Sequence, residues 1–204
     1  MMDIVKPAGG RGPGVLVAHP WWGLNQTIRD YGAALAQEGF VVGLPDLFDG
    51  AVTTTIEGAK QLAHSNWPSA TERLSKALNE LAEATGGPVG AVGFSYGAFH
   101  LMRLLETDLP LRSLAIYYAT FSPMPAGHAP VMAHLAEFDA EESTIDMQAL
   151  SDALAASGPP NAAFTYAGMK HWFAESDRPE FDAAAAGLAF KQSVDFLRVT
   201  LPAK

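Results

Sequence analysis

A serine flanked by glycines is the feature of this sequence that most clearly indicates chemistry. The pentapeptide Gly93-Phe94-Ser95-Tyr96-Gly97 follows an apolar run at 88–92 and precedes a run typical of a helix, which extends to residue 106. On a sharp turn from a strand into a helix, such a serine takes a strained conformation and its hydroxyl is lifted clear of the sheet. The first amides of the helix point toward the place where an oxyanion would form. Glycine is frequent enough here for a chance match, at 19 of 204 residues, but the surrounding strand and helix favour a nucleophile at Ser95.

A serine nucleophile needs a base to take its proton and a carboxylate to orient that base. On folds with such a turn the chain order is nucleophile, acid and histidine, with the last two in loops after later strands. His171 follows an apolar run at 163–166 in a loop that contains a glycine, and Asp139 follows the run at 131–135. The same acidic stretch contains three alternative acids, Glu137, Glu141 and Glu142. We predict a catalytic triad of Ser95, Asp139 and His171.

The segment His19-Pro20-Trp21-Trp22-Gly23 follows the first strongly apolar run, where a second oxyanion donor is expected. We predict that the backbone N–H groups of Trp21 and Tyr96 form the oxyanion hole, each donor contributing roughly 3 kcal/mol of transition-state stabilisation. His19 precedes the rest of the order, so we expect it to form a structural hydrogen bond and not to transfer protons. His134 lies within an apolar run and is expected to be a core histidine.

Short β-branched runs alternate with longer amphipathic segments, which is the pattern of parallel strands joined by crossover helices. Strands are expected at 15–18, 41–44, 89–92, 114–118, 131–135 and 163–166. Helices are expected at 27–38, 69–85, 96–106, 147–157 and 179–200. The length of 204 residues suits one domain over residues 1–204. The sequence therefore predicts a single α/β domain with a mostly parallel sheet and helices on both faces.

The composition argues against several other classes of protein. The chain has no cysteine, which rules out disulfides, thiolate catalysis and cysteine-bound metal. Its net charge is −9 and its 13 lysine and arginine residues form no basic run, so nucleic acid is not an expected partner. No apolar run approaches the roughly 18 residues of a membrane span, and no signal-peptide pattern is present, so we expect a cytoplasmic protein without a membrane partner. Nothing implies a cofactor or a metal, and the oligomeric state is left open.

Taken together, these segments resemble the dienelactone hydrolase family of α/β-hydrolases. The resemblance covers nearly the whole chain. Besides the serine turn and the loops of Asp139 and His171, it depends on Val15 to Gly23 with the following Leu24-Asn25-Gln26-Thr27-Ile28-Arg29-Asp30, on Gly39 to Phe48 with its Pro-Asp-Leu-Phe turn, on Ile116-Tyr117-Tyr118, and on Arg178-Pro179-Glu180-Phe181. The resemblance implies an α/β-hydrolase fold without a large cap domain, with the same triad and with the amides of Trp21 and Tyr96 as the oxyanion hole.

The chain departs from the family's best-known members at three positions. Those members have a cysteine where this chain has Ser95, and a glutamate that interacts with the thiol where it has Pro20. The two changes agree with each other and indicate an ordinary serine-hydrolase mechanism. Those members also bind a substrate carboxylate with an arginine four residues after the histidine, where this chain has Glu175. A carboxylate there would repel an anionic substrate, so neutral substrates are expected.

The sequence thus predicts a serine hydrolase that cleaves a small ester or lactone through an acyl-enzyme intermediate. The substrate pocket is expected to be lined by Trp22, Tyr118, Trp172, Phe173 and Glu175. Two alternatives stay open. A thioesterase or a small peptidase would use the same triad, and a non-catalytic protein with the α/β-hydrolase fold would only bind a ligand.

Overall fold

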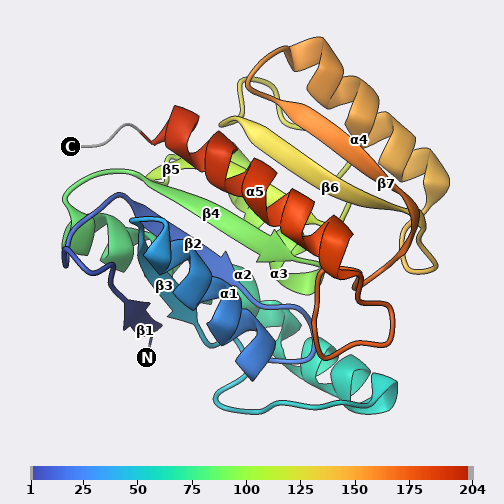
Figure 1. Ribbon diagram of the computed structural model, residues 1–204, viewed down its shortest axis with the longest axis horizontal. Helices are drawn as coiled ribbons and strands as arrows, with labels where there is room; N and C mark the ends of the chain where they lie inside the picture. The colour runs from blue at the N-terminus through green and yellow to red at the C-terminus, as the bar shows by residue number, and fades with distance from the viewer. Residues whose placement is uncertain (1, 202–204) are drawn as a thin grey trace.

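A seven-stranded sheet lies between two layers of helices in the computed structural model, which describes residues 2–201 (Figure 1). The strands are β1 (Met2–Val5), β2 (Gly14–Ala18), β3 (Val41–Pro45), β4 (Val89–Phe94), β5 (Leu111–Tyr117), β6 (Val131–Phe138) and β7 (Ala162–Lys170). Their order across the sheet is β1-β3-β2-β4-β5-β6-β7, and every neighbouring pair is parallel except β1 with β3. The predicted mostly parallel sheet of an α/β-hydrolase fold is confirmed.

The first strand is absent from the sequence-based prediction, which gave six strands. β1 pairs antiparallel with β3 at the edge of the sheet, and two of its four residues are exposed. A short run of mixed polarity carries no clear strand pattern of its own. Its hydrogen-bond partners lie on β3, some 40 residues further along the chain, so only the tertiary structure makes it a strand.

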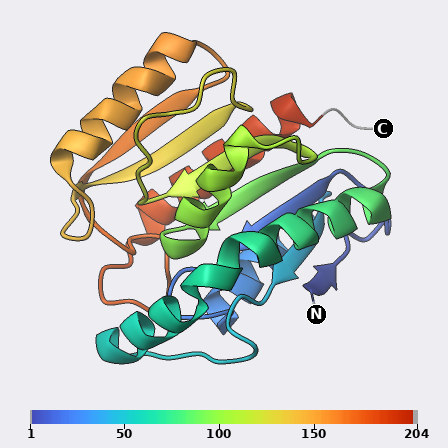
Figure 2. The same ribbon diagram turned by 180° about the vertical axis from the view of Figure 1, so that it is seen from behind.

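Helices cover both faces of the sheet (Figures 1 and 2). One face carries α1 (Gln26–Gln37) and α5 (Ala183–Thr200), and the other carries α2 (Ile56–Thr85), α3 (Tyr96–Met102) and α4 (Thr144–Ser157). Alternate side chains of β2 supply the two cores, with Leu16 on the α2 side and Val15 on the α1 side. Because both faces are covered, β2, β3 and β4 are apolar and buried along their whole length. No helix within residues 2–201 has the length and apolarity needed to cross a membrane.

The helix boundaries differ from the prediction mainly in α2. This helix begins at Ile56, where the Thr55 side chain accepts a hydrogen bond from the amide of Gly58, and it continues through Pro68. The predicted start of this helix at residue 69, after the proline, is therefore wrong, because residues 56–68 are helical as well. Packing holds the helix together where proline removes a backbone hydrogen bond. The other corrections are smaller: α4 begins at Thr144, α5 begins at Ala183, and the run at 96–106 ends in the 3-10 helix η1 (Arg103–Glu106).

The parallel strands bring four loops to one edge of the sheet. Ala18 at the end of β2 pairs with Gly93 of β4, Phe94 pairs with Tyr117 of β5, and Phe138 of β6 pairs with Lys170 of β7. The loops that leave β2, β4, β6 and β7 therefore leave the sheet in the same direction. In open α/β sheets this carboxyl edge is where ligands bind.

Candidate active site

Ser95 lies on the sharp turn between β4 and α3 in a strained backbone conformation, with φ 45° and ψ −108°. Its amide donates a 3.0 Å hydrogen bond to the carbonyl of Tyr117, which holds the turn against β5. The flanking glycines are required by close contacts of their own. A Cβ at Gly93 would lie 2.5 Å from the Cα of Ala98, and one at Gly97 would lie 2.6 Å from the carbonyl oxygen of His19. The glycines thus let α3 pack closely onto β4 and the turn after β2.

His171 connects Ser95 to Asp139 by hydrogen bonds. Its Nε2 lies 3.0 Å from Ser95 Oγ, and its Nδ1 lies 2.8 Å from each carboxylate oxygen of Asp139. The imidazole and the carboxylate have almost no exposed surface. Since the carboxylate can only accept from Nδ1–H, the network assigns the free lone pair to Nε2, which faces the serine hydroxyl. This is the arrangement that a base needs to accept the proton of Ser95.

Asp139, and none of the neighbouring glutamates, bonds to His171 in the described part of the chain. The amides of Glu141 and Glu142 donate to Asp139 Oδ1 at 2.9 and 3.1 Å, which holds the carboxyl group in position. Glu137 instead accepts from the amide of Gly168 at 2.7 Å, and Glu142 accepts from the Thr120 hydroxyl. Burial raises the pKa of the Glu142 carboxyl, although the Thr120 hydrogen bond opposes that shift. Of the four candidate acids, the structure brings only Asp139 to the base.

The two predicted oxyanion donors follow the ends of adjacent strands. Trp21 follows β2 and Tyr96 follows β4, and the ends of these strands pair directly. A turn closed by a 3.2 Å hydrogen bond from the Gly23 amide to the Pro20 carbonyl contains Trp21. Among residues 2–201, no backbone or side-chain group accepts a hydrogen bond from the amide of Trp21 or Tyr96. Both N–H groups are therefore free of protein acceptors, and their role stays a prediction.

Backbone strain is concentrated around His171. Ser95, Tyr118 and Trp172 all have positive φ values, which are 45°, 39° and 67°. The ring of Tyr118 lies 4.8 Å from the His171 imidazole, and that of Trp172 lies 5.1 Å from it. Such conformations are costly for side chains with a Cβ and cluster at functional sites.

Three tryptophans form an aromatic cluster beside the histidine. The ring centroids of Trp21, Trp22 and Trp172 lie 5.3–5.9 Å apart. The guanidinium of Arg178 lies 4.3 Å from the centroid of the Trp22 ring, which is a cation–π contact. No pattern in the sequence predicts this contact. Trp21 and Trp172 keep part of their surface exposed, whereas Trp22 is buried.

The other residues expected to line a pocket belong to the interior. Trp22, Tyr118, Phe173 and Glu175 have between 0% and 1% of their surface exposed, so of the five only Trp172 reaches the surface. They pack behind His171 because the loop after β7 folds back over the end of β5, where the Tyr118 hydroxyl donates a 2.8 Å hydrogen bond to Glu175 Oε1. If these four side chains line a substrate pocket, they do so from the interior, and that role stays a prediction.

Glu175 also has a different charge from the one expected. Burial raises the pKa of its carboxyl to about 8, although the hydrogen bond from Tyr118 lowers it. The second oxygen, Oε2, has no hydrogen-bond partner in the described structure, which suits a protonated carboxyl better than a carboxylate. At neutral pH the side chain is mostly uncharged, so the expected repulsion of anionic substrates does not arise from it.

His19 and His134, two of the histidines outside the triad, have structural contacts. His19 bonds to backbone groups on both ring nitrogens, and His134 bonds to Tyr166 and Ser193. Both imidazoles are fully buried, as expected from their places in the sequence. Among residues 2–201, no three histidine, aspartate or glutamate side chains are grouped as a metal ion would require.

Comparison with known proteins agrees with this geometry. The model of the dienelactone hydrolase family matches residues 3–201. "Protein usf" of Aquifex pyrophilus is 26% identical, over 96% of this chain and 91% of its own length. A protein of Azospirillum brasilense that carries the name carboxymethylenebutenolidase is 28% identical, over the same shares of the two chains.

Solved structures show the same fold. A dienelactone hydrolase-like promiscuous phosphotriesterase from metagenomic libraries superposes with a TM-score of 0.82 at 20% identity, over 98% of this chain and 92% of that one. A cold-adapted esterase from an Arctic intertidal metagenomic library gives a TM-score of 0.72 at 17% identity, over 98% and 88%. At these identities the likeness concerns the fold alone.

Proposed function

The chain belongs to the dienelactone hydrolase family, and from that premise we propose that it is a serine hydrolase that cleaves a small ester or lactone through an acyl-enzyme. The observation that carries the proposal is the chain of hydrogen bonds from Ser95 Oγ through His171 to Asp139. A serine with a base at 3.0 Å and a base with a carboxylate at 2.8 Å have the geometry of an activated nucleophile.

In the proposed reaction, Ser95 Oγ attacks the carbonyl carbon of the substrate while His171 Nε2 takes the hydroxyl proton. The tetrahedral intermediate then collapses, the alcohol leaves with the proton from Nε2, and the acyl group stays on Ser95. Water repeats the sequence on the acyl-enzyme: His171 removes its proton, and the acid is released with the serine hydroxyl restored. Asp139 keeps the imidazole in the required tautomer and stabilises the imidazolium formed in each half.

Negative charge develops on the substrate oxygen in both tetrahedral intermediates. The amides of Trp21 and Tyr96 are the proposed donors, and their freedom from protein acceptors supports this role. Both donors are backbone groups, so the proposal does not require the indole or phenol side chains to touch the oxyanion.

The substrate class follows from the family and from the surroundings of Ser95. The sheet has no inserted cap domain within residues 2–201, and Trp21 and Trp172 present partly exposed apolar rings near the triad. These features suit a small, largely apolar acyl or alcohol group. The relative named carboxymethylenebutenolidase supports an ester or lactone bond. The serine at the turn and the proline at position 20 support an oxygen nucleophile without an auxiliary carboxylate.

A fluorophosphonate probe tests the nucleophile directly, because it reacts covalently with an activated serine. We expect the protein to gain one adduct, located on Ser95 by peptide mass spectrometry, and to hydrolyse aryl acetates or butyrates. Ser95→Ala should remove both properties. A thioesterase or peptidase would take the label but prefer thioesters or amides in a matched substrate panel. A non-catalytic protein would take no label, and that result would overturn the proposal.

A further inference from the structure

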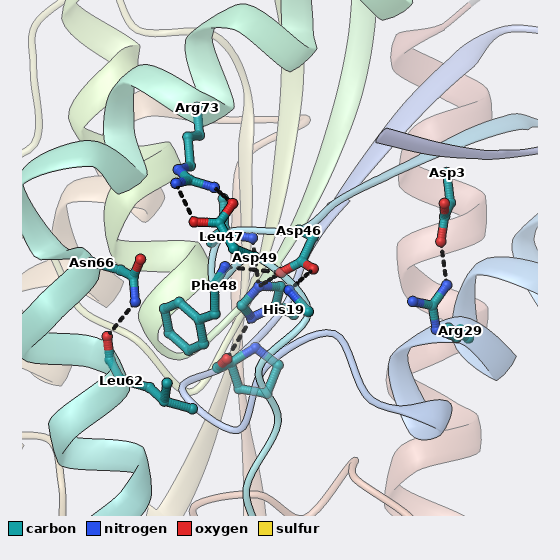
Figure 3. A network of polar contacts seen from close by, with 12 residues as sticks. Asp3, His19, Arg29, Asp46, Leu47, Phe48, Asp49, Leu62, Asn66 and Arg73 are labelled. Carbon is teal, nitrogen blue, oxygen red and sulfur yellow. Dashed lines mark hydrogen bonds and ion pairs between the residues drawn. The ribbon is translucent and has the colours of Figure 1, made fainter. Parts of the chain in front are cut away.

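His19 is held on both sides of its ring although it does not contact Ser95. The residue follows β2 directly and has no exposed surface. Its Nε2 lies 3.0 Å from the amide nitrogen of Leu47, and its Nδ1 lies 2.7 Å from the carbonyl oxygen of Pro20 (Figure 3). Since the Leu47 amide can only donate, Nε2 must accept, and the ring proton is therefore on Nδ1. His19 thus donates a hydrogen bond to the Pro20 carbonyl.

The imidazole of His19 is uncharged at neutral pH. Burial lowers the pKa of its imidazole to about 4, more than the Pro20 carbonyl and Asp46 raise it. A second ring proton would also face the Leu47 N–H, which is itself a donor. The neutral tautomer with its proton on Nδ1 is therefore the form that the fold selects.

The Pro20 carbonyl belongs to the same peptide group as the Trp21 N–H. A trans peptide is planar, so its C=O and N–H bonds point in opposite directions and turn together. A hydrogen bond that fixes the carbonyl therefore fixes the direction of the N–H. The Gly23 amide donates to the same carbonyl at 3.2 Å, which leaves the peptide little freedom to rotate. Donation to the carbonyl also polarises the peptide and strengthens its N–H as a donor.

We propose that His19 is a positioning residue for the oxyanion hole, which holds the Pro20–Trp21 peptide so that the Trp21 N–H faces the substrate oxygen. The inference rests on the proposed function, because it assigns the purpose of that N–H. It adds a residue that neither touches the substrate nor transfers a proton.

The turn after β3 provides the Leu47 N–H that donates to His19. Asp46 accepts hydrogen bonds from the amides of Phe48 and Gly50, and this folded turn presents the Leu47 N–H to the imidazole. Asp49 is paired through both carboxylate oxygens with Arg73 of α2, which ties the turn to the helix layer (Figure 3). Through His19, the Pro-Asp-Leu-Phe segment thereby helps to position the Trp21 N–H, although the segment lies away from the reacting atoms.

Two substitutions separate positioning from mere stability. The side-chain amide of asparagine reaches roughly where Nδ1 lies, so His19→Asn can still donate to the Pro20 carbonyl but loses the Leu47 contact. His19→Gln reaches roughly where Nε2 lies, so it can keep the Leu47 contact but loses the donation to Pro20. His19→Asn leaves the Leu47 N–H without its acceptor, whereas His19→Gln leaves the Pro20 carbonyl with the Gly23 amide as its donor. His19→Asn should therefore lose at least as much stability as His19→Gln, so a lower activity of His19→Gln cannot be a stability effect.

The activity of the two variants should differ. For an aryl ester, we expect His19→Gln to lower kcat about a hundredfold with little change in KM, as misplacement of a transition-state donor does. His19→Asn should stay within about fivefold of the parent. The ratio of ester to thionoester hydrolysis should fall in His19→Gln alone, because a sulfur anion depends less on hydrogen-bond donors. Rates are divided by the concentration of reactive serine, titrated with the fluorophosphonate probe, so unfolded protein does not count.

His134 supplies the matched control. It is equally buried, and both of its ring nitrogens are also hydrogen-bonded. It belongs to β6, however, and its partners are Tyr166 of β7 and Ser193 of α5. His134→Gln should lower the melting temperature and leave kcat and the ester-to-thionoester ratio unchanged. Equal kcat in the two His19 variants, or an unchanged ratio in His19→Gln, would overturn the positioning role while leaving the hydrolase intact. An unlabelled, inactive parent would instead remove the proposed function, and the inference with it.

Discussion

Gly97 packs against the backbone of His19, so that the turn carrying Ser95 and the turn carrying Trp21 are in direct contact. A Cβ at Gly97 would lie 2.6 Å from the His19 carbonyl oxygen and 2.7 Å from the carbonyl carbon of Ala18. The contact follows from the direct pairing of β2 with β4. The relative placement of the two proposed oxyanion donors therefore depends on the absence of a side chain at position 97.

Gly97→Ala should destabilise the protein and reduce its activity, because the backbone of β2 cannot move away from the new methyl group without disturbing the sheet. We expect a loss of about 2 kcal/mol or more in the free energy of unfolding, measured with urea. Gly187→Ala is the matched control, since its Cβ would meet nothing within 4 Å on α5. That variant should gain about 0.5–1 kcal/mol from its higher helix propensity and keep full activity. A stable, active Gly97→Ala protein would contradict the close contact.

Ser95→Ala should lower esterase activity by at least about a thousandfold, because the hydroxyl is the proposed nucleophile. Within residues 2–201 the Ser95 hydroxyl hydrogen-bonds to His171 alone, so the melting temperature should change little. Hydrolysis of an aryl acetate and circular dichroism measure the two effects. Ser151→Ala on α4, where the hydroxyl bonds to the Met147 carbonyl, should keep its activity. If Ser95→Ala retained activity, the nucleophile would lie elsewhere.

Asp139→Asn should lower kcat by about four orders of magnitude, because an amide cannot hold the His171 tautomer that leaves Nε2 free. Glu137→Gln, Glu141→Gln and Glu142→Gln should each cost less than about tenfold, since none of these side chains hydrogen-bonds to His171. Steady-state kinetics on the four variants decide between the acids. A large loss of kcat in Glu137→Gln together with a small loss in Asp139→Asn would refute the assignment of Asp139 as the acid.

Glu175→Gln should change how stability depends on pH. The folded protein keeps the Glu175 proton up to about pH 8, whereas the unfolded chain loses it near its ordinary value of 4.5. Between these values the native state binds more protons, so the parent's free energy of unfolding falls as pH rises, by up to about 1.4 kcal/mol per pH unit. The variant lacks this contribution, so its stability relative to the parent should rise from pH 5 to pH 8.

Urea titrations of the two proteins at matched pH values measure this difference. The buried histidines have lowered pKa values that act in the opposite direction below about pH 6.5, but they are common to both proteins and cancel. A difference independent of pH would show that Glu175 is ionised in the fold at neutral pH.

The serine turn and the alternation of strands and helices could be read from the sequence because both depend on local patterns. A glycine two positions from Ser95 on each side, an apolar run before it and a helical run after it all lie within residues 88–106. The same holds for the six predicted strands, of which β2, β3 and β4 are buried along their whole length because both faces of the sheet are covered. The edge strand β1 has no such pattern and was found only through its pairing with β3.

Contacts between distant segments decided three features that local patterns left open: the choice of acid, the charge of Glu175 and the partners of His19. Asp139 was the predicted acid but had three rivals within six residues of sequence, and only the fold showed that it is Asp139 that hydrogen-bonds to His171, 32 residues further along the chain. Glu175 was predicted to be a charged residue of the substrate pocket, but the packing of its loop over Tyr118 buries it and raises the pKa of its carboxyl. His19 could be recognised in the sequence as structural, whereas its partners Pro20 and Leu47 emerged only when the turn after β3 folded against β2. Motif and periodicity thus determined the fold class and the predicted nucleophile. Burial and hydrogen bonding, which depend on every segment packed around a side chain, determined charge, orientation and the choice among neighbouring residues of the same type.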